Sequence, residues 1–143
     1  MLLRASRVAF VVAMVALGGC DEREVPIDPQ RFAAPDVRAL LDGLREGDLV
    51  DGARVVRLGP PRDGTIQIEL ARGDLRFTVG IVKKGTSPPE HPPPIVTERY
   101  EIGVGNVVPT DASVSADSLL PVAHAIEARV KRRETSVPMP SGL

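Results

Sequence analysis

The sequence contains no tryptophan and few other aromatic residues, with one tyrosine and three phenylalanines in 143 residues. Phe10 lies in an apolar stretch near the start of the chain, which leaves fewer still for a folded domain. The core must therefore consist mainly of Val, Ile, Leu and Ala side chains. Large stacking surfaces built from aromatic rings are excluded by this composition.

Neither half of the chain is strongly basic. The chain has 18 Lys and Arg residues and 19 Asp and Glu residues, a net charge of −1. Residues 1–19 hold two arginines and no acidic residue, so the remainder carries 16 basic and 19 acidic residues, a net charge of −3. This balance argues against nucleic acid or anionic lipid headgroups as partners.

Cys20 is the only cysteine, so no disulfide can form within the chain. It follows Arg4, Arg7 and the apolar run VAFVVAMVALGG at 8–19, and it precedes the charged residues DERE. A basic start, an apolar run and a site of small residues are typical of a secretory signal peptide. The run is too short for a transmembrane helix, which needs about 20 apolar residues.

Leu17-Gly18-Gly19-Cys20 resembles the lipobox of bacterial lipoprotein precursors, in which a branched aliphatic residue and two small residues precede the cysteine. The alternative is an ordinary signal peptide with a cysteine at its end. The resemblance implies cleavage before Cys20 and a diacylglycerol on its sulfur, with two or three fatty acyl chains in the mature protein. One chain binds membranes only marginally, whereas two or more give a stable anchor.

The lipobox resemblance also implies a location, the cell membrane, with the folded part facing the periplasm or the exterior. Asp21 resembles the signal that retains lipoproteins in the inner membrane of some enteric bacteria. This rule differs between bacterial groups, so inner and outer membrane both remain open.

Composition divides the rest of the chain into three parts. Residues 20–34 are charged and rich in proline, which predicts a flexible tether. Residues 35–134 carry the periodic apolar pattern of one small domain. Residues 135–143 contain few core-forming residues, and we expect a disordered tail.

Hydrophobic periodicity predicts a helix at each end of the domain. The first spans 35–46, with Pro35 in its first turn and Gly47 after its end. The second starts near Asp117 or Ser118 and ends with the basic residues 131–133, which suit the negative helix end. Its apolar stripe consists of Leu119, Ala123, Ile126 and Val130.

Alternating or β-branched stretches predict four strands, at 53–58, 65–70, 75–82 and 95–104. A turn at 59–64 and a tight hairpin at Arg72-Gly73-Asp74 join the first three into an antiparallel meander. Loop 83–94 holds five prolines and precedes the fourth strand. We therefore expect an α+β two-layer sandwich in the order helix, three-strand meander, strand, helix, with both helices on one sheet face.

The chain offers little for metal or nucleophilic chemistry. His91 and His124 stand alone, without the paired spacing of metal ligands, and no metal or cofactor is expected. No serine or cysteine lies in a nucleophile motif. Three glutamates on the polar sheet face are the candidates for paired catalytic carboxylates: Glu69, Glu98 and Glu101. Charges on that face are expected in any case, and three arginines can neutralise them: Arg57, Arg76 and Arg99.

Pro89-Glu90-His91-Pro92 forms a PxxP sequence of the kind that binds in a polyproline conformation, although a rigid surface loop explains it equally. Together with the polar sheet face, it gives a possible interaction surface of six residues: Pro89, His91, Pro92, Arg76, Arg99 and Glu101. Arg72-Gly73-Asp74, the integrin-binding tripeptide, is explained by the hairpin turn.

The sequence thus predicts a membrane-anchored lipoprotein whose domain is a non-enzymatic interaction or assembly module of the envelope, with an envelope protein as partner. One alternative is a small-ligand-binding protein with a cavity between helices and sheet. Another is a hydrolase that uses Glu98 or Glu101.

Overall fold

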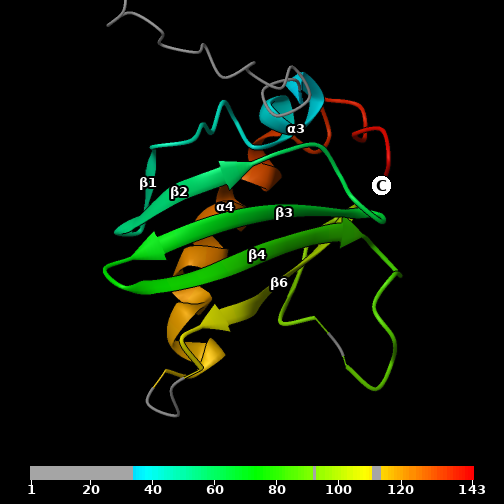
Figure 1. Cartoon of the computed structure of the whole chain (residues 1–143). Coiled ribbons are helices and arrows are strands. Elements are labelled where there is room, and N and C mark those ends of the chain that lie inside the picture. Colours follow the sequence, from blue (N-terminus) through cyan, green and yellow to red (C-terminus); the bar gives the residue numbers. More distant parts are fainter. Residues whose placement is uncertain (1–33, 92, 111–113) are drawn as a thin grey trace, which may run out of the picture.

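The computed structural model describes residues 34–91, 93–110 and 114–143, which form a six-stranded antiparallel sheet with two α-helices (Figure 1). The predicted leader, Cys20, the tether up to residue 33, and Pro92 lie outside the described residues. The α+β class is confirmed, but the number of strands is six and not four. Within the described ranges, no helix has the length and apolar character needed to cross a membrane.

The strands are β1 Leu49–Val50, β2 Ala53–Leu58, β3 Thr65–Arg72, β4 Leu75–Lys83, β5 Ile95–Val96 and β6 Tyr100–Val108. Their order in the sheet is β1-β2-β3-β4-β6-β5, and every neighbouring pair is antiparallel. The predicted meander corresponds to β2, β3 and β4, which are consecutive neighbours.

Two Asp-Gly turns join neighbouring strands of the sheet. Asp63 and Gly64 both have positive φ, 50° and 73°, as a two-residue type I′ turn requires. On either side of them, Arg62 and Thr65 exchange two backbone hydrogen bonds of 2.9 Å. Asp51-Gly52 makes the same kind of turn between β1 and β2, so the short strand β1, which periodicity missed, has a visible sequence signal.

The prediction of one strand over 95–104 is wrong, because this stretch is a hairpin of β5 and β6. A single strand would place Glu98 in a row of apolar side chains. The turn instead leaves Glu98 exposed, and the Thr97 N–H donates to the Tyr100 carbonyl at 2.8 Å. Strand β6 then runs on to Val108, beyond the predicted end.

The first helix, α3 Pro35–Leu40, is shorter than predicted. Asp42 and Gly43 adopt positive φ, 56° and 79°, which no helix can continue through. The Gly43 N–H donates to the Arg38 carbonyl at 2.9 Å, and this bond closes the end of the helix. The apolar stripe is nevertheless confirmed as buried: Val37, Leu40, Leu41 and Leu44.

The second helix is confirmed. A 3₁₀ turn, η1 Ala116–Leu119, leads directly into α4 Leu120–Arg133, and Pro121 lies in the first turn of α4, where its missing N–H does no harm. The predicted stripe faces the core: Leu119, Ala123, Ile126 and Val130 are fully or almost fully buried.

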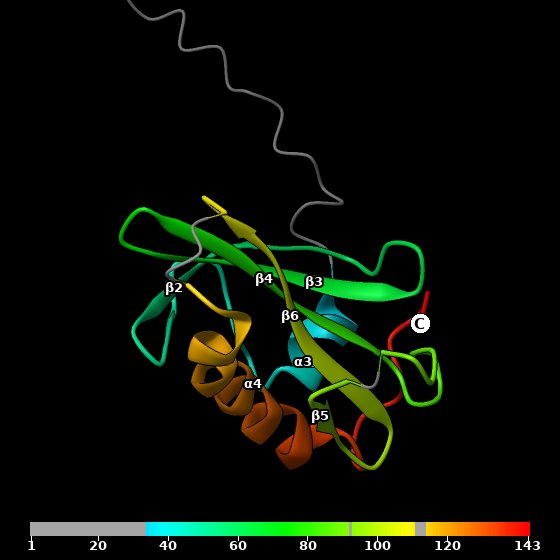
Figure 2. The ribbon, with the colours of Figure 1, turned by 90° about the horizontal axis from the view of Figure 1, so that it is seen from below.

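The core lies between the helices and one face of the sheet. Figure 2 shows α3 and α4 on the same side of the sheet. Alternate residues of the two central strands are buried on that side: Ile66, Ile68, Leu70, Phe77, Val79 and Ile81. Tyr100 and Phe77 are the largest buried side chains, so the core is otherwise aliphatic, as the composition predicts.

The last nine residues differ from the predicted disordered tail, because they pack against the domain. The Ser141 N–H donates to Asp36 Oδ2 at 3.0 Å, which ties the end of the chain to α3. Pro140 is buried, and Val137 and Met139 are half-buried against the core. The apolar residues of this segment thus cover the core edge without forming a helix or strand. They are too few and too irregularly spaced for periodicity to reveal their burial.

Candidate functional site

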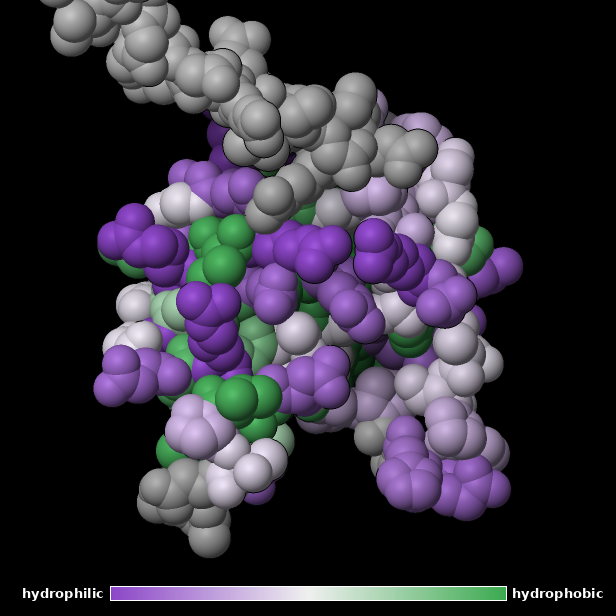
Figure 3. All heavy atoms as spheres, viewed as in Figure 1, coloured by the Kyte–Doolittle hydropathy of each residue, from purple (hydrophilic) through white to green (hydrophobic). Residues whose placement is uncertain are grey.

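The sheet face opposite the helices is hollowed into an open groove of about 910 Å³. We call it the outer groove and define it by its charged lining residues, Arg57, Arg62, Glu69 and Arg76. Its neutral polar lining residues are Thr65, Gln67, Thr78 and Asn106. Figure 3 shows this face, on which hydrophilic side chains spread over the strands with apolar ones between them.

Strand alternation explains why these side chains share one face. In β3, the residues between the buried Ile66, Ile68 and Leu70 point away from the helices. The strand register places Gly80 opposite Gln67 and Gly105 opposite Thr78. Two positions beside the polar residues therefore carry no side chain, which helps to keep this face open.

Two irregularities in the sheet help to aim the lining residues. The register shifts in β2 between Val55 and Arg57, so that Arg57 lies opposite Glu69 on the outer face. A second shift separates Arg76 from Thr78 in the β4–β6 pair, where Asn106 has a positive φ of 51°. The Asn106 side-chain amide donates to Thr78 Oγ1 at 3.3 Å, which fixes it over the groove.

The outer groove carries an excess of positive charge. Three arginines and one glutamate line it, a net charge of +2. The side chains of Arg57, Arg62 and Arg76 form no ion pair or hydrogen bond within the described part of the chain, and all three are exposed. Their guanidinium groups are therefore available to a ligand.

Glu101, predicted as an interaction residue on the polar face, is only 7% exposed. Its carboxylate accepts hydrogen bonds from the backbone N–H groups of Gly85 at 2.7 Å and Ser87 at 2.9 Å. The Ser87 hydroxyl and these N–H groups hold the pKa of Glu101 below its ordinary value. The prediction of an accessible Glu101 is wrong, because the residue anchors the start of the proline-rich loop.

Arg99 also makes internal contacts. Its guanidinium donates to the backbone carbonyls of Glu134 at 2.7 Å and Val137 at 3.2 Å. Its backbone N–H donates to the Glu134 carboxylate at 3.1 Å. Arg99 thus holds the C-terminal segment against the β5–β6 turn, and its guanidinium is not displayed on the outer face.

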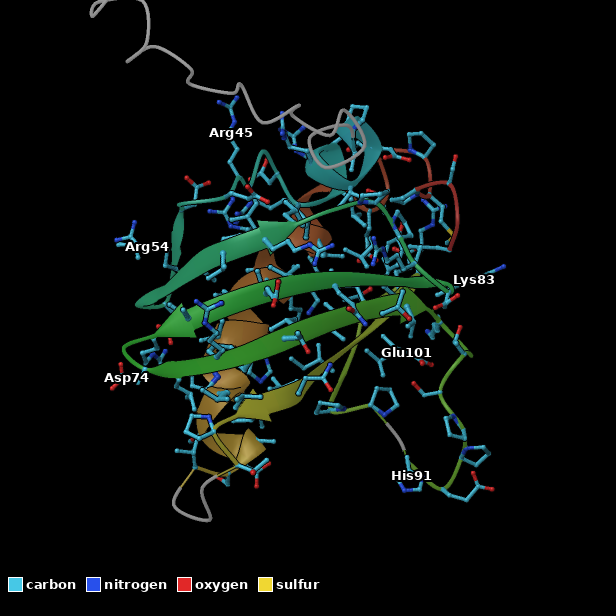
Figure 4. All side chains as sticks on the ribbon, viewed as in Figure 1. Arg45, Arg54, Asp74, Lys83, His91 and Glu101 are labelled. Carbon is cyan, nitrogen blue, oxygen red and sulfur yellow. The ribbon has the colours of Figure 1, made fainter. Side chains whose placement is uncertain are left out.

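The proline-rich loop lies apart from the outer groove. Pro89 and His91 are exposed, and the His91 N–H donates to the Pro88 carbonyl at 3.0 Å. Figure 4 shows His91 at the far end of the loop and Glu101 near its base. In the β4–β6 pair, Val82 lies opposite Glu101 and Arg76 lies opposite Val108. Six residues of β4 separate Val82 from Arg76, which corresponds to about 20 Å along the strand. Of the predicted interaction residues, the five that the structure describes do not form one surface, and among them only Arg76 lines the groove.

The three candidate catalytic glutamates are not brought together. The strand register aligns Glu101 with Val82 of β4, and Val82 with Thr65 of β3. Glu69 lies four residues further along β3 than Thr65, so Glu69 and Glu101 are offset by about 13 Å along the strands. Glu98 is exposed in the β5–β6 turn. Glu69 and Glu101 therefore lack the close spacing that shared acid–base work requires, and the Glu101 carboxylate is already held by the Gly85 and Ser87 N–H groups.

The two histidines do not contribute to the outer groove. His124 Nδ1 lies 2.8 Å from Glu127 Oε2 on the surface of α4, with the histidine side chain 59% exposed. A hydrogen bond from Lys131, and to a smaller extent one from His124, lowers the pKa of Glu127 below its ordinary value. Among the residues that the structure describes, no three His, Cys, Asp or Glu side chains are grouped closely enough to hold a metal ion.

Comparisons with family models, with curated proteins and with solved structures found no match for this chain. The outer groove was missed as a unit because its arginines come from β2, from the following turn and from β4, and periodicity does not give the register that joins them.

Proposed function

We propose that this protein is a lipid-anchored bacterial lipoprotein whose folded domain is a non-enzymatic interaction or assembly module of the cell envelope. The lipobox-like residues before Cys20 support the anchor, and the proline-rich segment that follows supports a tether. The observation that carries the interaction role is the outer groove, whose three arginines have no partner among the described residues.

The arrangement of the domain supports this role. We interpret it as a two-layer sandwich in which both helices cover one sheet face. The core is then complete, and the other sheet face takes no part in it. None of the described helices or strands covers the groove face, so this face can contact a partner. Anchoring raises the effective concentration of the domain near proteins of the same membrane, so that a modest affinity is sufficient.

Site-specific crosslinking in cells tests the proposal. Gln67 and Thr78 both line the groove. In the full-length chain, one of these two residues is replaced by a photoreactive residue. We expect adducts with an envelope protein from these positions. A matched probe at the exposed Ala128, on helix α4, is expected to give none. Equal labelling from Ala128 would contradict the proposal.

A second candidate is a small-ligand-binding lipoprotein. The volume of the groove, about 910 Å³, lies within the range of known ligand pockets. The sequence predicted such a cavity between helices and sheet, but this groove lies on the opposite face. A thermal-shift screen with envelope metabolites tests it: a compound that stabilises the wild type, but not the Gln67→Ala variant, supports this candidate over a protein partner.

A further inference from the structure

We propose that the outer groove binds an acidic, extended polypeptide segment of a partner, with its carboxylates on Arg57, Arg62 and Arg76. The proposal deepens the interaction function proposed above, on which it rests for its biological setting. The binding itself depends only on the folded domain.

The chemistry of the three arginines favours carboxylates. A guanidinium group offers parallel N–H donors that match the two oxygens of a carboxylate. Elsewhere in this domain two arginines pair with one carboxylate, since Arg132 Nε and Arg133 Nε each donate to one oxygen of Asp42, at 2.9 and 2.7 Å. Arg57, Arg62 and Arg76 have no such acceptor within the described residues, and the single glutamate of the groove leaves it positive.

The spacing of the arginines favours an extended ligand. Arg62 pairs with Thr65 at one end of the groove, and Arg76 lies opposite Ala71 at the other. Thr65 and Ala71 are six residues apart along β3, which corresponds to about 20 Å. A single phosphate or carboxylate cannot reach both ends, whereas an extended segment of about six residues can.

The residues between the arginines suit a peptide backbone. The side-chain amide of Gln67 makes no hydrogen bond within the described part of the chain, so it can both donate to and accept from a bound main chain. Pro60 and Pro61 line the Arg62 end of the groove, and the exposed Val108 lines the Arg76 end. These apolar side chains can pack against a ligand between or beside its carboxylates.

Membranes and single-stranded nucleic acid fit the groove less well. A narrow extended chain can lie in the hollowed surface and contact its arginines, whereas the planar headgroup layer of a membrane cannot enter the hollow. Base stacking requires exposed aromatic rings, but the only aromatic residue of the lining, Phe77, is 1% exposed. An acidic polypeptide is therefore the occupant that the charges and the shape favour.

The test measures binding of a fluorescent peptide of about eight residues, alternating Glu and Thr, to the full protein purified from membranes in neutral detergent. We expect saturable binding that weakens with added salt, and no binding of the same peptide with Gln in place of Glu. The combined variant Arg57→Gln, Arg62→Gln and Arg76→Gln is expected to weaken binding by at least about tenfold.

The matched control removes the same charge elsewhere. Arg45, Lys83 and Lys84 are exposed, lie outside the groove lining, and have no side-chain partner within the described residues. Figure 4 shows Arg45 and Lys83 at separate edges of the domain. The combined change of all three residues to Gln is expected to leave the peptide affinity within about twofold. A similar loss in both triple variants would overturn the proposal, because attraction would then come from overall charge.

Two competing occupants give distinct results. If vesicles with phosphatidylglycerol bind through the three groove arginines more tightly than the Glu peptide does, the occupant is the membrane surface and the proposal is overturned. The protein's own segment 20–33 contains Asp21, Glu22, Glu24 and Asp28. If neutralising these four residues strengthens peptide binding by about tenfold or more, this segment fills the groove and the partner assignment is overturned.

Failure of this proposal is distinguishable from failure of the proposed function. Groove crosslinks to an envelope protein that are unaffected by salt and by the arginine triple variant would leave the function standing and overturn the acidic segment. An unmodified Cys20 would overturn the lipoprotein function, while peptide binding to the groove would still be expected.

Discussion

The hydroxyl of Thr97 donates a hydrogen bond of 2.7 Å to the carboxylate of Glu134, although 37 residues separate the two. Both side chains are buried, with exposed fractions of 5% and 4%. The Arg99 N–H donates to the same carboxylate oxygen, so the end of α4 is joined to the β5–β6 turn by a buried polar contact. This contact fixes the edge of the sheet that periodicity misassigned.

Removing that contact is expected to destabilise the domain strongly. Glu134→Ala removes the acceptor of the part-buried Arg99 N–H and leaves the buried Thr97 hydroxyl only the Tyr100 carbonyl at 3.4 Å, at a cost of about 2 kcal/mol. Urea unfolding measures the loss. Glu98→Ala, at an exposed residue of the same turn, is the control and is expected to change stability by less than about 0.5 kcal/mol. Equal effects of the two changes would contradict the role of Glu134.

The stability of the proline-rich loop is expected to fall at acidic pH. The pKa of Glu101 is lowered in the folded protein, so the carboxylate stabilises the fold at neutral pH, and that contribution disappears as the pH falls through its folded pKa. Hydrogen exchange of the Gly85 and Ser87 amides, which donate to Glu101, reports the loss directly.

Glu101→Gln separates this titration from general acid denaturation. The variant lacks the negative charge at every pH, so the wild type is expected to be more stable at neutral pH and the difference to shrink below about pH 4. A stability difference that stays constant with pH would show that the carboxylate charge does not hold the loop.

Deletion of residues 135–143 is expected to destabilise the domain. Val137, Met139 and Leu143 are half-buried against the core and Pro140 is buried, so the truncated chain exposes apolar surface that the full chain covers. We expect a loss of about 2 kcal/mol or more in thermal or urea unfolding. Thr135→Ala, at an exposed residue of this segment, serves as the control. A truncated protein as stable as the full chain would restore the prediction of a disordered tail.

The contact between the end of α3 and α4 is expected to depend on salt. Asp42 accepts hydrogen bonds from Arg133 at 2.7 Å and Arg132 at 2.9 Å, and these two arginines lower its pKa. Asp42→Asn tolerates the same positive φ but removes the charge. We expect the variant to be less stable than the wild type at low salt, with the difference narrowing as salt screens the pair. A difference that is independent of salt would assign the effect to the backbone.

Local patterns predict the central part of this fold well. Alternation in 65–70 and 75–82 indicates both the strands and their buried face, because the faces of a strand follow directly from its two-residue period. The edges are less predictable. The end of α3 depends on the left-handed conformation of Asp42, and the split between β5 and β6 depends on the buried Glu134, which is distant in the sequence.

The candidate site is less predictable than the fold. Sequence reasoning identified Arg76 but treated Glu101 and Arg99 as equivalent polar residues of the same face. Their hydrogen bonds to loop and C-terminal backbone groups make them internal anchors, which only the tertiary structure reveals. The outer groove depends in the same way on two register shifts that place Arg57 and Asn106 beside residues of β3 and β4.

Mass spectrometry of the protein extracted from membranes of its native host tests the central claim most directly. We predict that the mature chain begins at Cys20 and that its N-terminal peptide carries a diacylglycerol with two or three fatty acyl chains in all. Cys20→Ser is expected to remain unprocessed and without lipid. A chain that begins at any other residue, or a free thiol at Cys20, would contradict a lipid-anchored module of the envelope.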